Sequence, residues 1–242
     1  MRYVIFSDIH GNALAFNSFL ADIKNIEYDK LVFLGDFLGY YYAPEEIISY
    51  CIENEVICLL GNHDSYFLEM LAGSLKEEIL VSRYGYSYTK AKETISDRSI
   101  KFLKSLQSFL FINDGLKNKI FFCHGSPLDT LNGRIYPDTD LNQFKNAVTD
   151  FSYVIFGHTH HKLLHTLGDT VFINPGSLGQ QRDGLGCSYI FLDTTDKKIN
   201  FRTISYDIYA LEAMVDQYDN GNIRLKSVLR RAPVENKIKN GN

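Results

Sequence analysis

Residues 2–12 read RYVIFSDIHGN, an apolar run of strand length that leads directly into two metal-binding types of side chain, Asp8 and His10. The run predicts a short buried strand over Arg2–Ser7. Asn12 can cap a following helix, because apolar residues recur at helical spacing beyond it. Asp8 and His10 are two positions apart, so in an extended loop their side chains face the same way. This succession indicates an α/β fold with a polar site at one edge of a sheet.

Four further apolar runs are each followed directly by side chains of types that bind metal ions. The residues at their ends are Asp36, Asn62, His124, and the pair His158 and His160. A glycine directly precedes three of these groups, and glycine lets the backbone turn tightly at such points. In open α/β sheets, ligands bind beyond the carboxyl ends of the strands. We therefore expect these residues to converge with Asp8 and His10 on one pocket.

The rest of the chain alternates between strand and helix periodicity. Further strands are predicted at 31–34, 55–60, 109–112, 119–123, 153–156, 170–174, 187–192 and 199–204, and helices at 44–54 and 141–148. Residues 64–106 lack strand signals and predict a helical insertion near the cleft, and residues 207–242 predict a C-terminal helical tail. Because one site draws on residues from both halves of the chain, residues 1–242 are expected to form a single domain.

Composition excludes several classes of protein. The chain has 242 residues, 45% of them hydrophobic, and a net charge of −4, which gives no basis for a long nucleic acid as partner. Its four cysteines form no CxxC pair and suit a reducing compartment. No signal peptide is visible, and no apolar stretch approaches the roughly 18 residues that span a bilayer. We expect a soluble cytoplasmic protein without membrane contact; the sequence indicates no oligomeric state.

The predicted ligands are two aspartates, one asparagine and four histidines. Oxygen and imidazole ligands suit two divalent ions, with manganese expected first and iron, zinc, cobalt or nickel as alternatives, whereas magnesium fits so many imidazoles less well. Seven ligands exceed what one tetrahedral ion takes. Asp36, the middle carboxylate, is the natural bridge between two cations about 3.5–4 Å apart. Such a pair acidifies water and stabilises charge on a phosphoryl group, which predicts hydrolysis of a small phosphorylated substrate.

Other side chains near these motifs are candidates for catalysis and substrate binding. His63 is not needed as a ligand and is predicted to be the general acid that protonates the leaving group, with Asp64 as its orienting carboxylate. Arg182 is the best candidate for binding a second phosphate. Arg83 and Arg134 are weaker candidates, because an arginine on the surface is the more common case.

Several aromatic and histidine residues allow two interpretations. The run Tyr40 to Tyr42 either stacks on a nucleobase, with Tyr40 as the substrate-binding residue, or packs the loop, which is favoured. The tyrosines at 84, 86 and 88 either cover the cleft or pack a helix. His161 and His165 are interpreted as solvent-facing residues outside the site.

Taken together, the motifs resemble the five signature blocks of the calcineurin-like metallophosphoesterase superfamily, in the family's order. The blocks are Asp8-Ile9-His10, Gly35-Asp36, Gly61-Asn62-His63-Asp64, His124-Gly125 and Gly157-His158-Thr159-His160. Residues 174–183, with Arg182, and Gly39-Tyr40 resemble the small bacterial and archaeal branch. The resemblance implies an α/β fold, a four-layer α-β-β-α sandwich of two mixed β-sheets flanked by helices.

The resemblance also implies a division of the ligands between two metals. One metal is expected to take Asp8, His10, Asp36 and His160, and the other Asp36, Asn62, His124 and His158. His63 corresponds to the family's catalytic histidine. The stretch after Asp36 lacks the Asp-Arg pair of the protein phosphatases in this superfamily, which favours a small-molecule substrate.

The sequence therefore predicts a binuclear metal-dependent phosphoesterase that attacks a small phosphomonoester or phosphodiester, which can be a nucleotide, with metal-bound hydroxide. One alternative is a dinucleoside polyphosphate hydrolase. A second, from another class, is a metal-free scaffold or binding module on the same fold, although every ligand position is filled.

Overall fold

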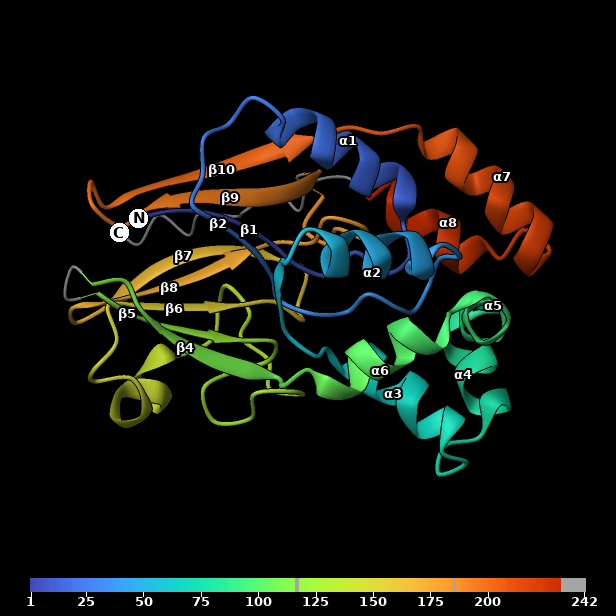
Figure 1. Cartoon of the computed structure of the whole chain (residues 1–242), viewed down its shortest axis with the longest axis horizontal. Helices are drawn as coiled ribbons and strands as arrows, with labels where there is room; N and C mark the ends of the chain where they lie inside the picture. Colours follow the sequence, from blue (N-terminus) through green and yellow to red (C-terminus); the bar gives the residue numbers. More distant parts are fainter. Residues whose placement is uncertain (116–117, 185, 232–242) are drawn as a thin grey trace, which may run out of the picture.

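The structure is a computed structural model that describes residues 1–115, 118–184 and 186–231. Within these residues, two five-stranded sheets stack on one another (Figure 1). The order of the first sheet is β10 (Lys198–Ile204), β9 (Cys187–Asp193), β1 (Arg2–Phe6), β2 (Lys30–Phe33), β3 (Ile57–Cys58). The order of the second is β4 (Phe109–Asn113), β5 (Lys119–Cys123), β6 (Tyr153–Phe156), β8 (Thr170–Pro175), β7 (Lys162–Leu167).

Each sheet combines three adjacent strands that pair in parallel with two strands that pair antiparallel to a neighbour. In the first sheet β1, β2 and β3 run parallel, and β9 and β10 are antiparallel to their neighbours. In the second sheet β5, β6 and β8 run parallel, and β4 and β7 are antiparallel. The parallel strands of each sheet therefore end at a common edge, which is where the polar motifs follow them.

Helices cover the outer faces and one end of the sandwich (Figure 1). The helices are α1 (Ala13–Ile23), α2 (Pro44–Glu53), α3 (Asn62–Leu71), α4 (Glu77–Tyr84), α5 (Ser87–Thr94), α6 (Asp97–Ser105), the 3₁₀-helix η1 (Leu141–Ala147), α7 (Ile208–Asp219) and α8 (Ile223–Leu229). Asn12 caps α1 by accepting a hydrogen bond from the N–H of Ala15, and Pro44 begins α2. Helices α3 to α6 occupy the stretch predicted as a helical insertion.

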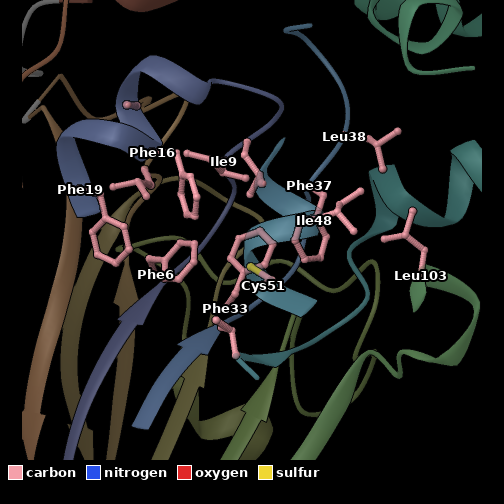
Figure 2. Close-up of a cluster of buried hydrophobic side chains, with 14 of the residues drawn as sticks. Phe6, Ile9, Phe16, Phe19, Phe33, Phe37, Leu38, Ile48, Cys51 and Leu103 are labelled. Atoms are coloured by element: carbon pink, nitrogen blue, oxygen red, sulfur yellow. The ribbon is translucent and has the colours of Figure 1, made fainter. Parts of the chain in front are cut away.

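The four layers follow from the alternation of side chains along β1. Val4 and Phe6 point toward α1 and α2, whereas Tyr3 and Ile5 point toward the second sheet. Figure 2 shows Phe6 of β1 beside Phe19 of α1, with ring centroids 4.7 Å apart. The second sheet alternates in the same way, because its outward-facing residues pack on η1. The predicted α-β-β-α sandwich of two mixed sheets is confirmed.

Some boundaries differ from the sequence prediction. Strand β7 was not predicted: only one of its six residues is buried, so no period-2 pattern marks it, and it forms as an edge strand through backbone pairing with β8. The strand expected over 55–60 is only Ile57–Cys58, because the following residues bond to Phe33 and Gln107 as a loop. The helix expected over 141–148 is a 3₁₀-helix.

The C-terminal helical tail predicted for 207–242 contains α7 and α8 as far as the structure describes it, and residues 232–242 lie outside the described residues. The single-domain organisation of residues 1–242 stays a prediction. In the described part of the chain, no helix combines the length and apolar character that crossing a membrane requires.

Candidate metal centre

Seven polar side chains from both sheets meet at the common edge. Asp8 follows β1, Asp36 follows β2, Asn62 begins α3 after β3, His124 follows β5, and His158 and His160 follow β6, while His10 lies in the loop after Asp8. The structure therefore brings together all seven residues that the sequence predicts as metal ligands. Neighbouring parallel strands end side by side, and stacking of the two sheets brings both sets of strand ends together.

The seven residues form two groups that share Asp36. Ligand atoms of Asp8, His10, Asp36 and His160 lie within 4.8 Å of one another, and so do those of Asp36, His124 and His158. Asn62 completes the second group, because its Oδ1 lies 3.0 Å from His124 Nε2 and 2.8 Å from His158 Nδ1. These groups match the two ligand sets that the family resemblance implies.

Asp36 occupies the centre of this arrangement. Its Oδ1 accepts a hydrogen bond of 2.8 Å from the backbone N–H of His63. Its Oδ2 is buried and has no hydrogen-bond partner among the described residues. This oxygen lies 3.7 Å from His10 Nε2 and 3.5 Å from His124 Nε2, at the boundary of the two groups. A buried carboxylate oxygen without a partner is costly unless a cation meets it.

Backbone carbonyls fix the orientation of three imidazoles. The Nδ1 atoms of His10, His124 and His160 lie 2.7, 2.8 and 2.6 Å from the carbonyl oxygens of Leu38, Leu34 and Gln180. Each contact assigns the proton to Nδ1 and directs Nε2 toward the centre, as outer-shell partners of metal-bound histidines do. His158 is reversed, because its Nδ1 faces Asn62 and its Nε2 accepts a hydrogen bond of 3.1 Å from Arg134 Nε.

The backbone is left-handed at five of the seven residues. The φ angles of Asp8, His10, Asp36, His158 and His160 lie between 53° and 68°. Residues other than glycine rarely adopt this conformation, and it persists only where surrounding structure enforces it. Here, hydrogen bonds such as Asp8 N–H to Gly35 O (3.0 Å) and His10 N–H to Asp36 O (2.9 Å) enforce it. Such strain concentrates at functional sites.

The electrostatic environment shifts the pKa values of these groups. Burial lowers the pKa of His124, but the Asp36 carboxylate outweighs burial and raises it to about 9. Burial and the charge of His124 together lower the pKa of His158 to about 3. Burial raises the pKa of Asp8, but His160 outweighs it and lowers the value to about 2. A cation bound here would therefore meet ionised carboxylates and displace a proton from His124.

The donor set suits divalent metal ions. In the first group of ligands, His10 Nε2 lies only 3.0 Å from His160 Nε2, and His160 Nε2 lies 3.3 Å from Asp8 Oδ1. Converging imidazole nitrogens and carboxylate oxygens without thiolates favour first-row ions such as manganese, iron, cobalt, nickel or zinc. Together with the unpartnered oxygen of Asp36, this geometry indicates divalent metal binding.

His63 lies beside the ligands and is held by an aromatic residue. Its Nδ1 lies 2.7 Å from the Tyr88 hydroxyl, which also donates to the His63 carbonyl at 3.3 Å. Asp64 was predicted to orient this ring. Instead, the Asp64 carboxylate accepts backbone hydrogen bonds from Asp36 and Gly61 (both 2.9 Å) and from Leu38 (3.1 Å). The prediction is wrong on this point: Asp64 caps α3 and holds the Asp36 loop, because its side chain points back over the helix N-terminus.

No pattern in the sequence identifies Tyr88 as the partner of His63. Tyr84 and Tyr88 are four positions apart, the spacing of one helical face, but Tyr84 ends α4 and Tyr88 lies in a separate helix, α5. Both rings lie near His63, with centroid distances of 4.6 Å for Tyr84 and 6.2 Å for Tyr88. The cluster of tyrosines at 84, 86 and 88 is the signal in the sequence that points to these two residues.

Tyr40 and Arg182 lie at the rim of the site. Both line a cavity of about 150 Å³ that also contains Asp36, His63 and His158. Arg182 Nη2 donates to the Tyr40 hydroxyl at 2.8 Å, and the Tyr40 ring lies 5.0 Å from that of His63. Two other residues considered from the sequence, Arg134 and Tyr84, line the same cavity.

The remaining aromatic and histidine candidates lie outside the metal site, where they pack against helices, are exposed or line another cavity. Tyr41 and Tyr42 are buried against α7 and α8, so loop packing is the correct interpretation for those two residues. His165 is exposed on β7. His161 lies outside the metal site, where it is half-buried and lines a second, larger cavity.

Comparison with known proteins identifies the family. Residues 1–197 match the family described as the calcineurin-like phosphoesterase superfamily domain. An uncharacterized protein of Methanocaldococcus jannaschii is 33% identical over 228 residues, which cover 84% of this chain and 87% of the relative. A crystal structure of a metallophosphoesterase from Sphaerobacter thermophilus matches with a TM-score of 0.78 and 25% identity, and the match covers 95% of this chain and 98% of that one. A hypothetical protein from Pyrococcus horikoshii shares the fold, with a TM-score of 0.80, 19% identity and the same coverage. The chain belongs to the calcineurin-like phosphoesterase superfamily and is a metal-dependent phosphoric ester hydrolase.

Proposed function

We propose that the protein is a binuclear phosphoesterase that hydrolyses a small phosphomonoester or phosphodiester. The observation that carries the proposal is the buried Asp36 Oδ2, which has no hydrogen-bond partner among the described residues and faces both groups of ligands. A carboxylate in this position can bridge two cations and offset their repulsion. Manganese is the expected ion, with iron, zinc, cobalt or nickel as alternatives.

Two cations, when bound, would supply a nucleophile from water near neutral pH and neutralise charge on the phosphoryl oxygens. The chain itself contributes the positions of these charges. The backbone N–H of His63 donates to Asp36 Oδ1, which restrains rotation of the carboxylate away from the ligands. The inner cavity of about 150 Å³ has room for a phosphoryl group but not for a macromolecular surface.

His63 is proposed as the general acid for the leaving group. Tyr88 occupies Nδ1, which leaves Nε2 without a protein partner among the described residues. Burial lowers the pKa of His63 to about 4, although Asp36 opposes this effect. A phosphate dianion beside the ring would raise that pKa and favour protonation of Nε2 when substrate binds. Asp64 supports this site indirectly, through the backbone of Asp36.

Tyr40 and Arg182 are proposed to bind the substrate. Arg182 carries five N–H donors in a planar fork that matches phosphate oxygens. The hydrogen bonds from its Nη2 to Tyr40 Oη (2.8 Å) and Gln180 Oε1 (3.0 Å) hold the guanidinium at the rim. The Tyr40 side chain thereby helps to position the charge that would hold the phosphoryl group.

The function is tested by metal analysis and a panel of phosphate esters. We expect the purified protein to bind about two Mn²⁺ ions per chain and to hydrolyse small phosphate esters only with metal present. His63→Ala should lose more activity on alkyl esters than on nitrophenyl esters, because a good leaving group needs no acid. The matched control is His165→Ala, an exposed histidine on β7. A protein that takes up no metal and hydrolyses none of the esters would instead favour the scaffold alternative.

A dinucleoside polyphosphate hydrolase is the second candidate within this class. The observation that favours it is the pairing of an arginine with an aromatic ring at the rim, since the Arg182 guanidinium lies 5.8 Å from the centroid of the Tyr40 ring. Such a pair suits both phosphate and a nucleobase. Comparing phosphate release from dinucleoside polyphosphates with cleavage of simple diesters separates the two candidates. A cytoplasmic location stays a prediction.

A further inference from the structure

A second and larger cavity adjoins the metal site. Its volume is about 550 Å³, against about 150 Å³ for the cavity at the ligands. Tyr40, Tyr84, Tyr136 and Arg182 line both, so the two cavities share a wall. A volume of this size falls in the range of roughly 300–1,000 Å³ that is usual for small-molecule sites. A single phosphoryl group needs far less room.

The outer cavity is positively charged. Four arginines line it, at positions 83, 182, 224 and 231, and no aspartate or glutamate is found among the described residues of its lining. The whole chain carries a net charge of −4, so this is a local excess of positive charge. Within the described residues, none of the four forms a salt bridge with a carboxylate. Clustered guanidinium groups without protein counter-charges attract an anion with several negative charges.

Arg182 connects the two cavities. Both of its side-chain hydrogen bonds use Nη2, so the donors on Nε and Nη1 have no protein partner in the described part of the chain. Its backbone N–H donates to the His160 carbonyl at 3.2 Å, which fixes the residue relative to a metal ligand. A phosphate held by Arg182 from the outer side would therefore lie next to a phosphoryl group at the metal site.

Two helices that are distant in the sequence supply two of the other three arginines. Arg83 belongs to α4 and Arg224 to α8, and both helices lie at the same end of the molecule (Figure 1). Asp219 at the end of α7 joins the segments: its Oδ1 accepts from the Tyr86 N–H at 2.8 Å and its Oδ2 accepts from the Tyr42 hydroxyl at 2.5 Å. This link ties the end of α7, which precedes α8, to the turn that follows α4.

We infer that the outer cavity is a second anion subsite, which binds non-scissile phosphate on the part of the substrate that leaves. The inference rests on the proposed function and extends it from simple esters to the phosphoanhydride bonds of compounds with at least two phosphates, such as nucleoside polyphosphates. The phosphoryl group undergoing hydrolysis lies at the metal ligands, and the remaining phosphates lie against Arg182, Arg83 and Arg224. The exposed ring of Tyr136 at the cavity wall is placed to contact an organic group attached to them.

Binding of inorganic tripolyphosphate to chelator-treated protein tests the subsite without catalysis. Calorimetry should show binding to the wild type that weakens as salt concentration rises. Arg224→Gln and Arg83→Gln should each weaken it about tenfold or more, the effect of removing a hydrogen bond to a charged group. The control is Arg98→Gln, an exposed arginine on α6 outside both cavities. If neither cavity variant differs from this control, the inference is wrong.

Activity of the manganese-loaded enzyme then separates the sources of the phosphates. We expect kcat/KM for a nucleoside triphosphate, relative to 4-nitrophenyl phosphate, to fall about tenfold in Arg224→Gln. If kcat/KM for tripolyphosphate falls by the same factor in Arg224→Gln, the cavity binds the phosphates alone. If kcat/KM falls further for the nucleotide than for tripolyphosphate, the cavity also contacts the organic group. Tripolyphosphate binding without any ester hydrolysis would overturn the proposed function while supporting the subsite. An unchanged ratio in the variant would overturn the subsite while leaving the phosphoesterase intact.

Discussion

The Tyr88 hydroxyl lies 2.7 Å from His63 Nδ1 and donates to the carbonyl oxygen of the same histidine. Tyr88 is fully buried, so its position is fixed by packing and it fixes the ring in turn. This contact occupies one ring nitrogen and leaves the other for a leaving group. Tyr88 is thereby a positioning residue for the proposed general acid.

Removal of the Tyr88 hydroxyl tests this role. Tyr88→Phe keeps the shape of the core, and we expect kcat/KM for alkyl phosphate esters to fall about tenfold, the value of one hydrogen bond in the transition state. The fall for nitrophenyl esters should be smaller, because their leaving group needs no proton. Steady-state kinetics on both ester types measures the difference. Tyr86→Phe, at a side chain 46% exposed, is the control; equal losses on both ester types would assign Tyr88 a structural role alone.

Asp36→Asn tests the shared carboxylate. The variant keeps the volume of the side chain but removes the charge that both groups of ligands share. We expect turnover to fall at least a hundredfold, beyond the roughly 10–100-fold effect of losing an outer-shell partner. The folded protein should persist, and the rise in Tm that Mn²⁺ gives the wild type should shrink or disappear.

The control for this variant is Asp196→Asn, in an exposed turn between β9 and β10. Thermal unfolding with and without Mn²⁺ measures the response of each protein. Full activity in a folded Asp36→Asn protein would show that the carboxylate does not take part in catalysis.

Gly39 is required for the position of His63. Its φ is +87°, and a Cβ at this position would lie 2.2 Å from His63 Nδ1. Gly39→Ala should therefore displace the imidazole and reduce activity on alkyl esters, in addition to about 1–2 kcal/mol of backbone strain. Gly73→Ala is a matched control, because its φ is +78° but no atom lies within 4 Å of the added Cβ. Both variants should lose similar free energy from strain, but only Gly39→Ala should lose activity. Urea unfolding and kinetics measure the two effects, and full activity in Gly39→Ala would contradict the expectation.

Tyr3 is expected to limit stability at alkaline pH. Its hydroxyl is buried in the interface between the sheets without a hydrogen-bond partner among the described residues. Burial, with a contribution from Asp114, raises its pKa from 10.0 to about 12. A pKa that is higher in the folded than in the unfolded chain contributes stability that is complete below pH 10. This contribution is lost as pH rises from 10 through about 12.

Tyr3→Phe removes both the buried hydroxyl without a partner and its ionisation at alkaline pH. The variant should be more stable by about 1 kcal/mol at neutral pH, because an unsatisfied buried hydroxyl is gone, and should lose less stability between pH 10 and 12. Denaturant unfolding at several pH values measures this, with exposed Tyr209→Phe as the control. A steeper alkaline loss in Tyr3→Phe than in the wild type would contradict the assignment.

The sequence determined the fold class and the set of candidate metal ligands, because both depend on local patterns. Apolar runs of strand length placed β1, β2, β5 and β6 to within a residue or two, and the polar residues that follow such runs must lie where strands end. The helical insertion was also predictable, since its residues lack any strand pattern. Edge strand β7 was not, because backbone pairing and not side-chain burial stabilises it.

Only the tertiary structure decided which side chains support and surround the ligands. The contact of His63 with Tyr88, the backbone contacts of Asp64 and the left-handed φ angles of five ligands depend on how separate segments pack. The same holds for the arginine-lined cavity, which forms where α4, α8 and the loop of Arg182 meet. A local pattern records which face of an element is apolar. It does not record which distant residue will lie against it, because that depends on the packing of the whole chain.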